Sequence, residues 1–273
     1  MLRLTFFLPL LALTFVIAPA APAVATDAPS AQLPLKNLPV PGENFLVAGR
    51  PAFLIASPHA PAGQPKPWVW YAPTLPPYPG NEEKWLIDQL LAAGIAVAGI
   101  DVGESYGSPT GRKIFTALHT ELTSARGYSA KPVLLGRSRG GLQLLSWAAD
   151  HPDRVAAFAG IYPVCNLMSY PGLAKASPAY ELSADQLAAA LSVHNPIDRL
   201  APLAAARIPL FAIHGDEDKL VPLAANSGLV RDRYLALGGT MELIIPPGQG
   251  HSLWSGFFQS PALVAFIRRH ATP

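Results

Sequence analysis

The stretch Pro132-Val133-Leu134-Leu135-Gly136-Arg137-Ser138-Arg139-Gly140 decides the fold of this 273-residue chain. Its apolar beginning predicts a strand, and the residues from Gly141 to Ala149 favour a helix. Between the two, a G-x-S-x-G motif predicts a sharp turn, the nucleophile elbow, with Ser138 at its tip. Glycines two residues before and after the serine let strand and helix pass closely, because they carry no Cβ. Ser138 is therefore the first candidate site residue.

Apolar strands and helical segments alternate along the rest of the chain. Such alternation predicts a parallel sheet covered by helices on both faces. Two apolar runs around Gly49-Arg50 predict a hairpin that adds an antiparallel edge. We therefore expect an α/β fold with a mostly parallel, doubly wound sheet. The predicted strands are 44–48, 51–55, 67–71, 95–100, 132–135, 155–161, 209–213 and 241–245, and the predicted helices are 82–93, 114–122, 141–149, 183–191, 224–237 and 261–269.

The segment 162–208 interrupts this alternation. It contains Pro171, Gly172 and Pro196 and only one helical piece, 183–191. An insertion at this place would form a small cap over the strand ends. A crossover helix with long loops fits the same composition equally well, and both interpretations stay open on the sequence.

The first 25 residues have the pattern of a secretory signal peptide. Arg3 precedes an apolar run, 4–17, and Ala23-Val24-Ala25 matches an A-x-A cleavage site. The apolar run is shorter than the ~20 residues that a membrane span needs. We expect a Pro/Ala-rich linker at 26–41 and one domain at 42–273. The mature protein is then expected to be exported, periplasmic or extracellular, without a stable membrane span.

The composition excludes several classes of protein. Half of the residues are hydrophobic and 14% are charged, so the chain can bury a core and is not disordered. A net charge of +2 without Lys/Arg runs does not predict a nucleic-acid partner. Cys165 is the only cysteine, which excludes an internal disulfide. The histidine spacing does not indicate a metal site, and no cofactor is implied.

A nucleophilic serine needs a base to take its proton and a carboxylate to orient that base. The stretch His214-Gly215-Asp216-Glu217-Asp218-Lys219-Leu220-Val221-Pro222 follows one predicted strand, and Gly248-Gln249-Gly250-His251 follows the last. Both lie at the carboxyl ends of parallel strands, where open α/β sheets place their sites. By position, Asp216, Glu217 and Asp218 are all candidate acids, and His251 is the candidate base.

These motifs, in this order, resemble those of the α/β-hydrolase family, from about Phe45 to about Arg269. The family's H-G-x-x-D-x-x-V-P pattern falls on residues 214–222 and selects Asp218 as the acid. Asp216 would then cap the loop, and His214 would have a structural role. The resemblance implies an α/β-hydrolase fold in which Ser138, Asp218 and His251 form a catalytic triad.

Acyl transfer also requires two backbone N–H donors, which form an oxyanion hole. Arg139, directly after the nucleophile, is expected to supply one. The loop Ala72-Pro73-Thr74-Leu75 is expected to supply the other, although it departs from the family's usual His-Gly. Pro73 has no N–H, so Thr74 is the preferred donor and Leu75 the second choice.

Two arginines, Arg137 and Arg139, flank the serine. A permanent cation there suits a substrate with a carboxylate or many oxygens, whereas an ion pair with Glu104 or Asp101 would make an arginine structural. Arg139 is similar to the arginine after the serine in glucuronoyl esterases (G-C-S-R-x-G). The similarity is local, because Arg137 replaces the cysteine of that motif.

Four aromatic residues lie in loops near predicted strand ends and are candidates for a sugar platform, although packing explains them as well. They are Tyr106, Tyr162, Tyr170 and Trp254. The predicted substrate-binding residues are Arg137, Glu104, Tyr106 and Trp254.

The sequence therefore favours a serine esterase that forms an acyl-enzyme with a small-molecule or carbohydrate ester. Two alternatives remain: a serine peptidase of the same fold, and a catalytically inactive binding protein on that fold.

Overall fold

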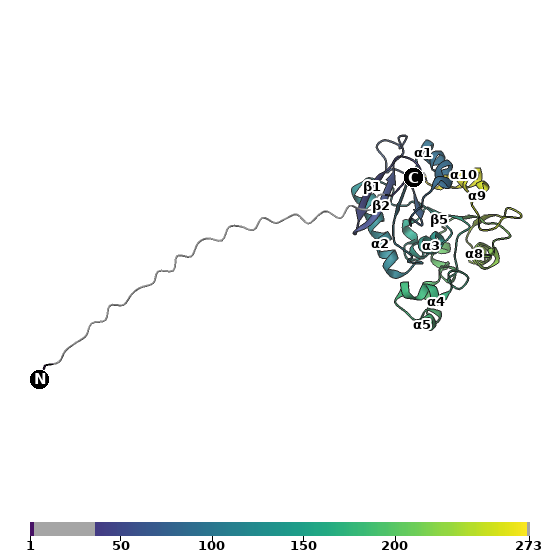
Figure 1. The fold of residues 1–273 in the computed structure, drawn as a ribbon. Helices are drawn as coiled ribbons and strands as arrows, with labels where there is room; N and C mark the ends of the chain where they lie inside the picture. Colours follow the sequence, from purple (N-terminus) through teal and green to yellow (C-terminus); the bar gives the residue numbers. More distant parts are fainter. Residues whose placement is uncertain (3–35, 272–273) are drawn as a thin grey trace. The chain divides into compact units, whose positions relative to one another are not determined.

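The structure is a computed structural model that describes residues 1–2 and 36–271 (Figure 1). The predicted signal peptide, apart from its first two residues, and most of the predicted linker lie outside the described residues. By its contacts the chain divides into Met1–Leu33 and Pro34–Pro273, and all helices and strands below belong to the second unit. Within the described residues, none of the helices is both long enough and apolar enough to cross a membrane.

The described residues contain one eight-stranded sheet with the order β1-β2-β4-β3-β5-β6-β7-β8. β2 is antiparallel to both of its neighbours, and the other pairs are parallel. The predicted sheet and its antiparallel hairpin are thus confirmed. The strands are β1 Glu43–Val47, β2 Arg50–Ile55, β3 Trp68–Ala72, β4 Ala96–Ile100, β5 Val133–Arg137, β6 Ala157–Ile161, β7 Leu210–Ile213 and β8 Met241–Ile244.

The hairpin between β1 and β2 turns on two residues, Ala48 and Gly49. Their φ angles are 49° and 71°, and Val47 pairs with Arg50 across the turn. A two-residue turn with both φ angles positive matches the right-handed twist of the flanking strands.

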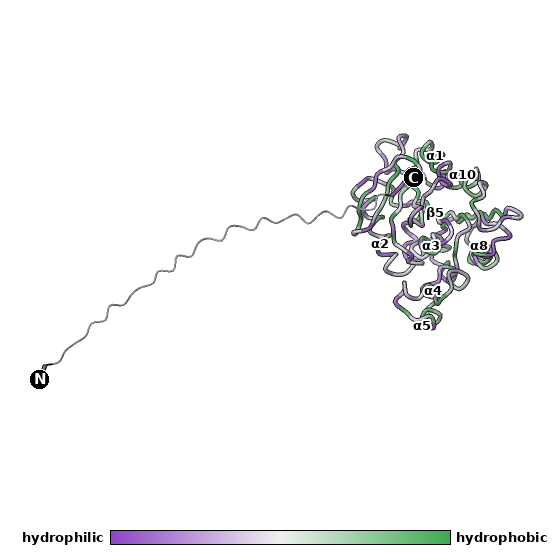
Figure 2. Tube along the Cα trace, in the orientation of Figure 1, coloured by the Kyte–Doolittle hydropathy of each residue, from purple (hydrophilic) through white to green (hydrophobic). Residues whose placement is uncertain are grey.

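Helices cover both faces of the sheet. One face carries α2 Pro109–Thr120, α3 Gly140–Asp150 and α8 Ser227–Ala236, whose buried side chains form one core with the strands. The other carries α1 Lys84–Ala92 and α10 Pro261–Ala271, which form a second core. Both α8 and α10 carry hydrophobic and hydrophilic residues (Figure 2), and the hydrophobic ones include the buried Val230 of α8 and the buried Leu263 and Ile267 of α10.

Two helices begin three or more residues away from their predicted starts. α2 begins at Pro109 rather than at 114, because Ser108 caps its first turn by accepting a hydrogen bond from the Gly111 amide. The polar first turn of α2 carries no apolar periodicity, which explains the error. α8 begins at Ser227 rather than at 224, since Leu223–Ala225 forms a separate 3-10 turn.

The segment between β6 and β7 is a small helical insertion. Its short helices are α4 Leu173–Ala176, α5 Ala184–Ala189, α6 Leu191–His194 and α7 Ala201–Ala205. Buried residues of the insertion, such as Tyr180 and Leu187, pack with Tyr106 and Leu142 in a third apolar cluster. This cluster joins the insertion to the region that follows β4 and β5.

Candidate active site

Ser138 occupies the turn between β5 and α3 in a left-handed conformation, with a φ of 49°. This conformation is unfavourable for a residue with a Cβ. Three backbone hydrogen bonds hold it: the Ser138 amide donates to Ile161 O at 2.9 Å, and its carbonyl accepts from Gly141 N at 3.0 Å and Val164 N at 2.8 Å. The strain is thus offset by contacts with β6 and the loop after it.

The glycines of the motif stand where other chain segments pass closely. A Cβ on Gly140 would lie 2.0 Å from the Ala72 carbonyl oxygen, and a Cβ on Gly136 would lie 2.9 Å from Gly141 Cα. The first contact brings the loop after β3 against the start of α3. The second brings β5 against α3, as the motif predicted.

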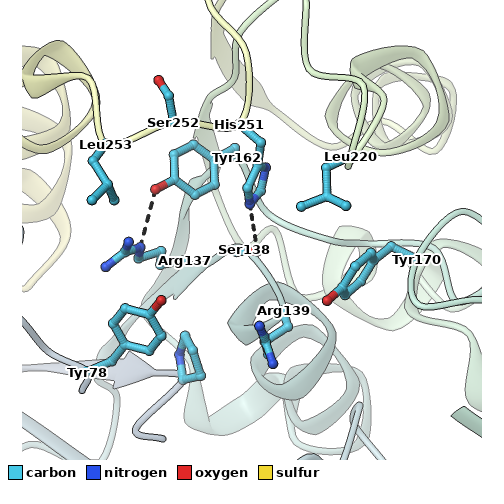
Figure 3. Close-up of a pocket in the computed structure, with 11 residues that line it drawn as sticks. Tyr78, Arg137, Ser138, Arg139, Tyr162, Tyr170, Leu220, His251, Ser252 and Leu253 are labelled. Atoms are coloured by element: carbon cyan, nitrogen blue, oxygen red, sulfur yellow. Dashed lines mark hydrogen bonds between the residues drawn. The ribbon is translucent and has the colours of Figure 1, made fainter. Parts of the chain in front are cut away.

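The structure brings Ser138, His251 and Asp218 together, although they are far apart in the sequence. The Ser138 hydroxyl donates to His251 Nε2 across 2.9 Å (Figure 3). His251 Nδ1 donates to Asp218 Oδ2 across 2.7 Å. His251 lies in the loop after β8 and Asp218 in the loop after β7. The three side chains form one continuous line of hydrogen bonds.

Asp218 has the environment of a permanently ionised carboxylate. Its side chain is 0% exposed, and its Oδ1 accepts from Leu220 N at 3.0 Å and Val221 N at 2.8 Å. Burial alone would raise the pKa of Asp218, but hydrogen bonds from His214, His251 and the Val221 amide outweigh it and hold the pKa well below its ordinary value.

The other two candidate acids point elsewhere. Asp216 is exposed and accepts a 3.3 Å hydrogen bond from the Gln249 amide, and Glu217 is exposed. His251 Nδ1 therefore bonds to Asp218, the residue that the H-G-x-x-D pattern selects.

The expected oxyanion donors lie on either side of the close contact at Gly140. Arg139 is the N-cap residue of α3, and Pro73 lines the same cavity as Ser138. The Thr74 side chain is buried, and a Cβ on Gly99 would lie 2.5 Å from its Cγ2, so the methyl group packs toward β4. The Thr74 hydroxyl is buried without a hydrogen-bond partner among the described residues. We therefore take the backbone amide as the candidate donor.

The serine opens onto a cavity of about 310 Å³. Figure 3 shows its aromatic and aliphatic side chains around Ser138 and His251. Several of these residues carry no sequence signal: Tyr78 lies between prolines after β3, and Leu220, Ser252 and Leu253 flank Asp218 and His251. The lining residues are Pro73, Tyr78, Arg137, Ser138, Arg139, Tyr162, Tyr170, Leu220, His251, Ser252 and Leu253.

Arg137 lines this cavity but pairs with a residue that sequence analysis missed. Its Nη1 donates to Glu83 Oε1 at 2.6 Å, and its Nε donates to the Tyr162 hydroxyl at 3.2 Å. The expectation of a pair with Glu104 or Asp101 is wrong for Arg137, because Asp101 pairs with Arg50. Burial alone would lower the pKa of Arg137, but charge interactions, with Glu83 among them, raise it above its ordinary value.

Arg139 does pair with Glu104, at the exposed rim of the site. Of the other two predicted substrate-binding residues, neither lines the cavity. Tyr106 is 5% exposed and packs in the third cluster, where its carbonyl accepts from the Tyr180 hydroxyl. Trp254 is 41% exposed and packs edge-on against Phe257.

Two of the four loop aromatics do line the cavity, namely Tyr162 and Tyr170. The Tyr162 ring lies 4.3 Å from the His251 ring, centroid to centroid, and supports the imidazole from one side. Burial raises the pKa of Tyr162 to about 12, so its hydroxyl stays protonated at neutral pH.

A family model matches residues 116–270, and its description is the prolyl oligopeptidase family. The match spans Ser138, Asp218 and His251. No curated protein matches the sequence of this chain.

Solved structures with the same arrangement of elements include a dipeptidyl peptidase, MPT51 and Est1E. Dipeptidyl peptidase 4 of Porphyromonas gingivalis superposes with a TM-score of 0.67 at 16% identity, over 84% of this chain and 35% of its own. MPT51 of Mycobacterium tuberculosis has a TM-score of 0.66 at 16% identity, over 85% and 100%. Est1E of Butyrivibrio proteoclasticus has a TM-score of 0.62 at 17% identity, over 85% and 99%. The chain thus spans about a third of the length of the dipeptidyl peptidase, and at these identities the likeness establishes a shared fold.

Proposed function

Because this chain belongs to the prolyl oligopeptidase family and is a serine hydrolase of the α/β-hydrolase fold, we propose that it cleaves carboxylic esters through an acyl-enzyme. The observation that carries the proposal is the line of hydrogen bonds from Ser138 through His251 to Asp218, which opens onto the cavity.

In the first half of the reaction, Ser138 Oγ attacks the carbonyl carbon of the ester while His251 Nε2 takes the hydroxyl proton. Asp218 keeps the other proton of His251 on Nδ1 and stabilises the imidazolium that forms. Because Asp218 is buried and its Oδ1 is held by two amides, it keeps this orientation without rearrangement.

The tetrahedral intermediate places negative charge on the former carbonyl oxygen. We assign the amides of Arg139 and Thr74 to this oxyanion, because the contact at Gly140 brings their two segments together beside Ser138. Collapse of the intermediate releases the alcohol, which takes its proton from His251. Water then repeats the sequence on the acyl-enzyme, so the carboxylic acid leaves and Ser138 recovers its proton.

A peptidase of the same fold is the second candidate function, and the family match favours it. Its most direct form, removal of amino acids from a peptide N-terminus, would place an ammonium group near the serine. Among the described residues that line the cavity, none is acidic. Nearby Glu83 and Glu104 are each paired with an arginine. This charge pattern supports an ester substrate over an aminopeptidase substrate.

The tyrosines of the cavity support a small or carbohydrate ester. Tyr78, Tyr162 and Tyr170 present three rings around a space of about 310 Å³. Aromatic faces with polar edges suit sugar rings and short acyl groups. Est1E and the S-formylglutathione hydrolase of Agrobacterium tumefaciens, an enzyme named for the hydrolysis of a thioester, share the fold over most of their length.

We also propose that the protein is exported. The support is the sequence of the first 25 residues, with Arg3, the apolar run and the Ala23-Val24-Ala25 site. Expression of the full chain with a C-terminal tag, followed by fractionation and N-terminal sequencing, tests this. A mature protein that begins at Thr26 outside the cytoplasm is expected, and an uncleaved cytoplasmic chain would contradict it.

The catalytic proposal is tested with Ser138→Ala. The wild type should hydrolyse p-nitrophenyl acetate and react with a fluorophosphonate probe, and the variant should do neither while it keeps the circular dichroism of the wild type. Unchanged hydrolysis by the variant contradicts the mechanism. A wild type inactive toward esters and amides alike supports the binding-protein alternative.

A panel of aminoacyl p-nitroanilides beside p-nitrophenyl esters separates the two enzymes. A higher kcat/KM on the anilides, after each is divided by its uncatalysed rate, would favour the peptidase.

A further inference from the structure

An ion pair is buried in the wall of the cavity. The Arg137 side chain is 6% exposed and the Glu83 side chain 1%, and 2.6 Å separates Arg137 Nη1 from Glu83 Oε1. The desolvation of such a pair is costly, and its net effect on stability is often small or unfavourable. The hydrolytic mechanism above uses neither side chain, so the pair needs another explanation.

Glu83 is fixed from three sides. Its Oε1 also accepts from the Tyr71 hydroxyl at 2.8 Å, and its Oε2 accepts from the Gly80 amide at 2.8 Å. The carboxylate therefore has a single orientation, which it imposes on the guanidinium of Arg137.

The plane of the guanidinium is fixed as well. Arg137 Cζ lies 4.4 Å from the ring centre of Tyr78 and 4.9 Å from that of Phe258, and its Nε donates to Tyr162. Aromatic rings stabilise a guanidinium by stacking and by cation–π attraction. Figure 3 shows the head group of Arg137 between Tyr78 and Tyr162, beside Ser138.

Part of this rigid group is left without a partner. Within the described part of the chain, the guanidinium of Arg137 has three hydrogen-bond partners, namely Glu83, Tyr162 and the Tyr71 hydroxyl. The side chain lines the same cavity as Ser138. A guanidinium has five N–H donors in a fixed fork, so donors remain available to a molecule in that cavity.

The charge of Arg137 is already neutralised. Glu83 balances Arg137, and Glu104 balances Arg139. A carboxylate bound to the remaining donors of Arg137 would add a second negative charge close to Glu83. A neutral oxygen acceptor would accept a hydrogen bond from the guanidinium without that repulsion. Of the two substrates that a cation beside the serine suggested, one with a carboxylate and one with many oxygens, this geometry favours the second.

We propose that Arg137 binds an uncharged oxygen of the substrate, a carbonyl, ether or hydroxyl oxygen outside the scissile ester. The substrate class is thus an ester with a second, neutral oxygen close to the reacting carbonyl, as in alkoxy, hydroxy or sugar esters. This inference rests on the proposed esterase function and adds the group that the cavity recognises.

The test compares three p-nitrophenyl esters: the methoxyacetate, its oxygen-free analogue the butanoate, and the hydrogen glutarate, which carries a carboxylate. Each kcat/KM is divided by the uncatalysed rate of the same ester in the same buffer. For the wild type, this corrected kcat/KM should be about tenfold or more higher for the methoxyacetate than for the butanoate. Such a ratio is in line with a hydrogen bond from a charged donor. The hydrogen glutarate should be the poorest of the three.

Two variants then separate recognition from charge. In Glu83→Gln/Arg137→Met the buried pair is gone, and the ratio of methoxyacetate to butanoate should fall to about one. In Glu83→Gln alone, no carboxylate balances the charge of Arg137. The corrected kcat/KM of the hydrogen glutarate should then rise about tenfold relative to that of the methoxyacetate. If this single variant does not fold, the double variant, which leaves no buried charge unpaired, still decides.

Arg112→Met/Arg199→Met/Asp150→Asn is the matched control, because it removes the Asp150 carboxylate together with both arginines that pair with it, at 2.9 Å and 2.5 Å. Its ratios should equal those of the wild type. Circular dichroism and fluorophosphonate labelling report folding and the reactivity of Ser138 in every variant.

A wild type that hydrolyses all three esters without an oxygen preference, or a double variant with the wild-type ratio, overturns the inference and leaves the esterase function intact. A wild type that neither hydrolyses the esters nor reacts with the probe overturns both.

Discussion

Nε2 of His214 lies 3.3 Å from Oδ2 of Asp218, the same oxygen that contacts Nδ1 of His251 at 2.7 Å. His214 is fully buried, and its Nε2 also lies 2.8 Å from the Val221 carbonyl oxygen. Since a carbonyl can only accept, Nε2 of His214 carries a proton, and Nδ1 lies 2.8 Å from the Ser227 hydroxyl. His214 therefore donates toward the proposed catalytic carboxylate and acts as a positioning residue.

Replacement of His214 should lower kcat by about tenfold, because a buried carboxylate loses a donor and a hydrogen bond to a charged group contributes about 1.5–3 kcal/mol. His214→Met removes the donor at similar volume, whereas His214→Gln keeps an N–H. Steady-state kinetics on p-nitrophenyl acetate should show partial rescue by glutamine. Equal losses in both variants, matched by equal falls in thermal stability, would mean that the residue only packs.

Replacement of the two aspartates in the loop after β7 should change kcat to very different extents. Asp218→Asn leaves the imidazole of His251 without its ionised partner, and kcat should fall about 10⁴-fold, the effect typical of a triad aspartate. Asp216→Asn loses only one long contact with the Gln249 amide and should stay within about threefold of the wild type. The kcat of the two variants, measured side by side at saturating ester, checks the assignment. The opposite ranking would make Asp216 the acid.

Much of the site was predictable because motifs and strand order act together. G-x-S-x-G, H-G-x-x-D and G-x-G-H each follow a strand, and parallel strands bring their carboxyl ends to one edge. The sheet itself follows from continuous apolar runs. The positions of Ser138, Asp218 and His251 were thus accessible without a structure.

The side chains around Arg137 at the cavity, Glu83 and Tyr78, were not predictable in the same way. Glu83 lies in a 3-10 turn before α1, 54 residues from Arg137, and its own sequence context is that of a solvated helix start. Tyr78 occupies a proline-rich loop without periodicity. Side chains of this kind meet through tertiary packing alone, so no local pattern records the contact. The same lack of a pattern led the sequence analysis to include Tyr106 and Trp254, which do not line the cavity.

His119 should make the stability of the fold depend on pH. Its side chain is buried beside Trp70 and Trp147, with Nε2 donating to the Ala130 carbonyl at 2.8 Å, and burial lowers its pKa below the ordinary value. Below about pH 6.5 the unfolded chain takes up a proton that the folded chain resists. The stability that His119 contributes is therefore complete above about pH 6.5 and is lost as the pH falls toward its folded value.

The measurement is the free energy of unfolding in urea at pH 7.5, 6.5 and 5.5 for the wild type and His119→Gln. The variant should lose less stability between pH 7.5 and 5.5 than the wild type, although its absolute stability is lower. His59→Gln is a suitable control, because His59 is exposed. The change of its unfolding free energy with pH should equal that of the wild type. If the unfolding free energy of His119→Gln fell as steeply with pH as that of the wild type, His119 would not be the source of the pH dependence.

Gly140 is the point at which fold and chemistry depend on the same close contact. An added Cβ would lie 2.0 Å from the Ala72 oxygen and 2.7 Å from Pro73 N, and both are backbone atoms that cannot yield locally. Gly140→Ala should therefore displace the loop after β3, which carries the proposed Thr74 donor. We expect a loss of stability of about 1–3 kcal/mol, the range for overpacking, and a larger loss of kcat than of substrate affinity, since an oxyanion donor acts mainly in the transition state.

Gly250→Ala provides the comparison, because a Cβ there would find only the Glu217 oxygen, at an ordinary 3.6 Å. Its unfolding free energy should stay within about 0.5 kcal/mol of the wild type. Urea unfolding and steady-state kinetics of both variants test the argument. If Gly140→Ala kept the wild-type kcat while it lost stability, the loop after β3 would be a packing element, and the second oxyanion donor would have to be sought outside it.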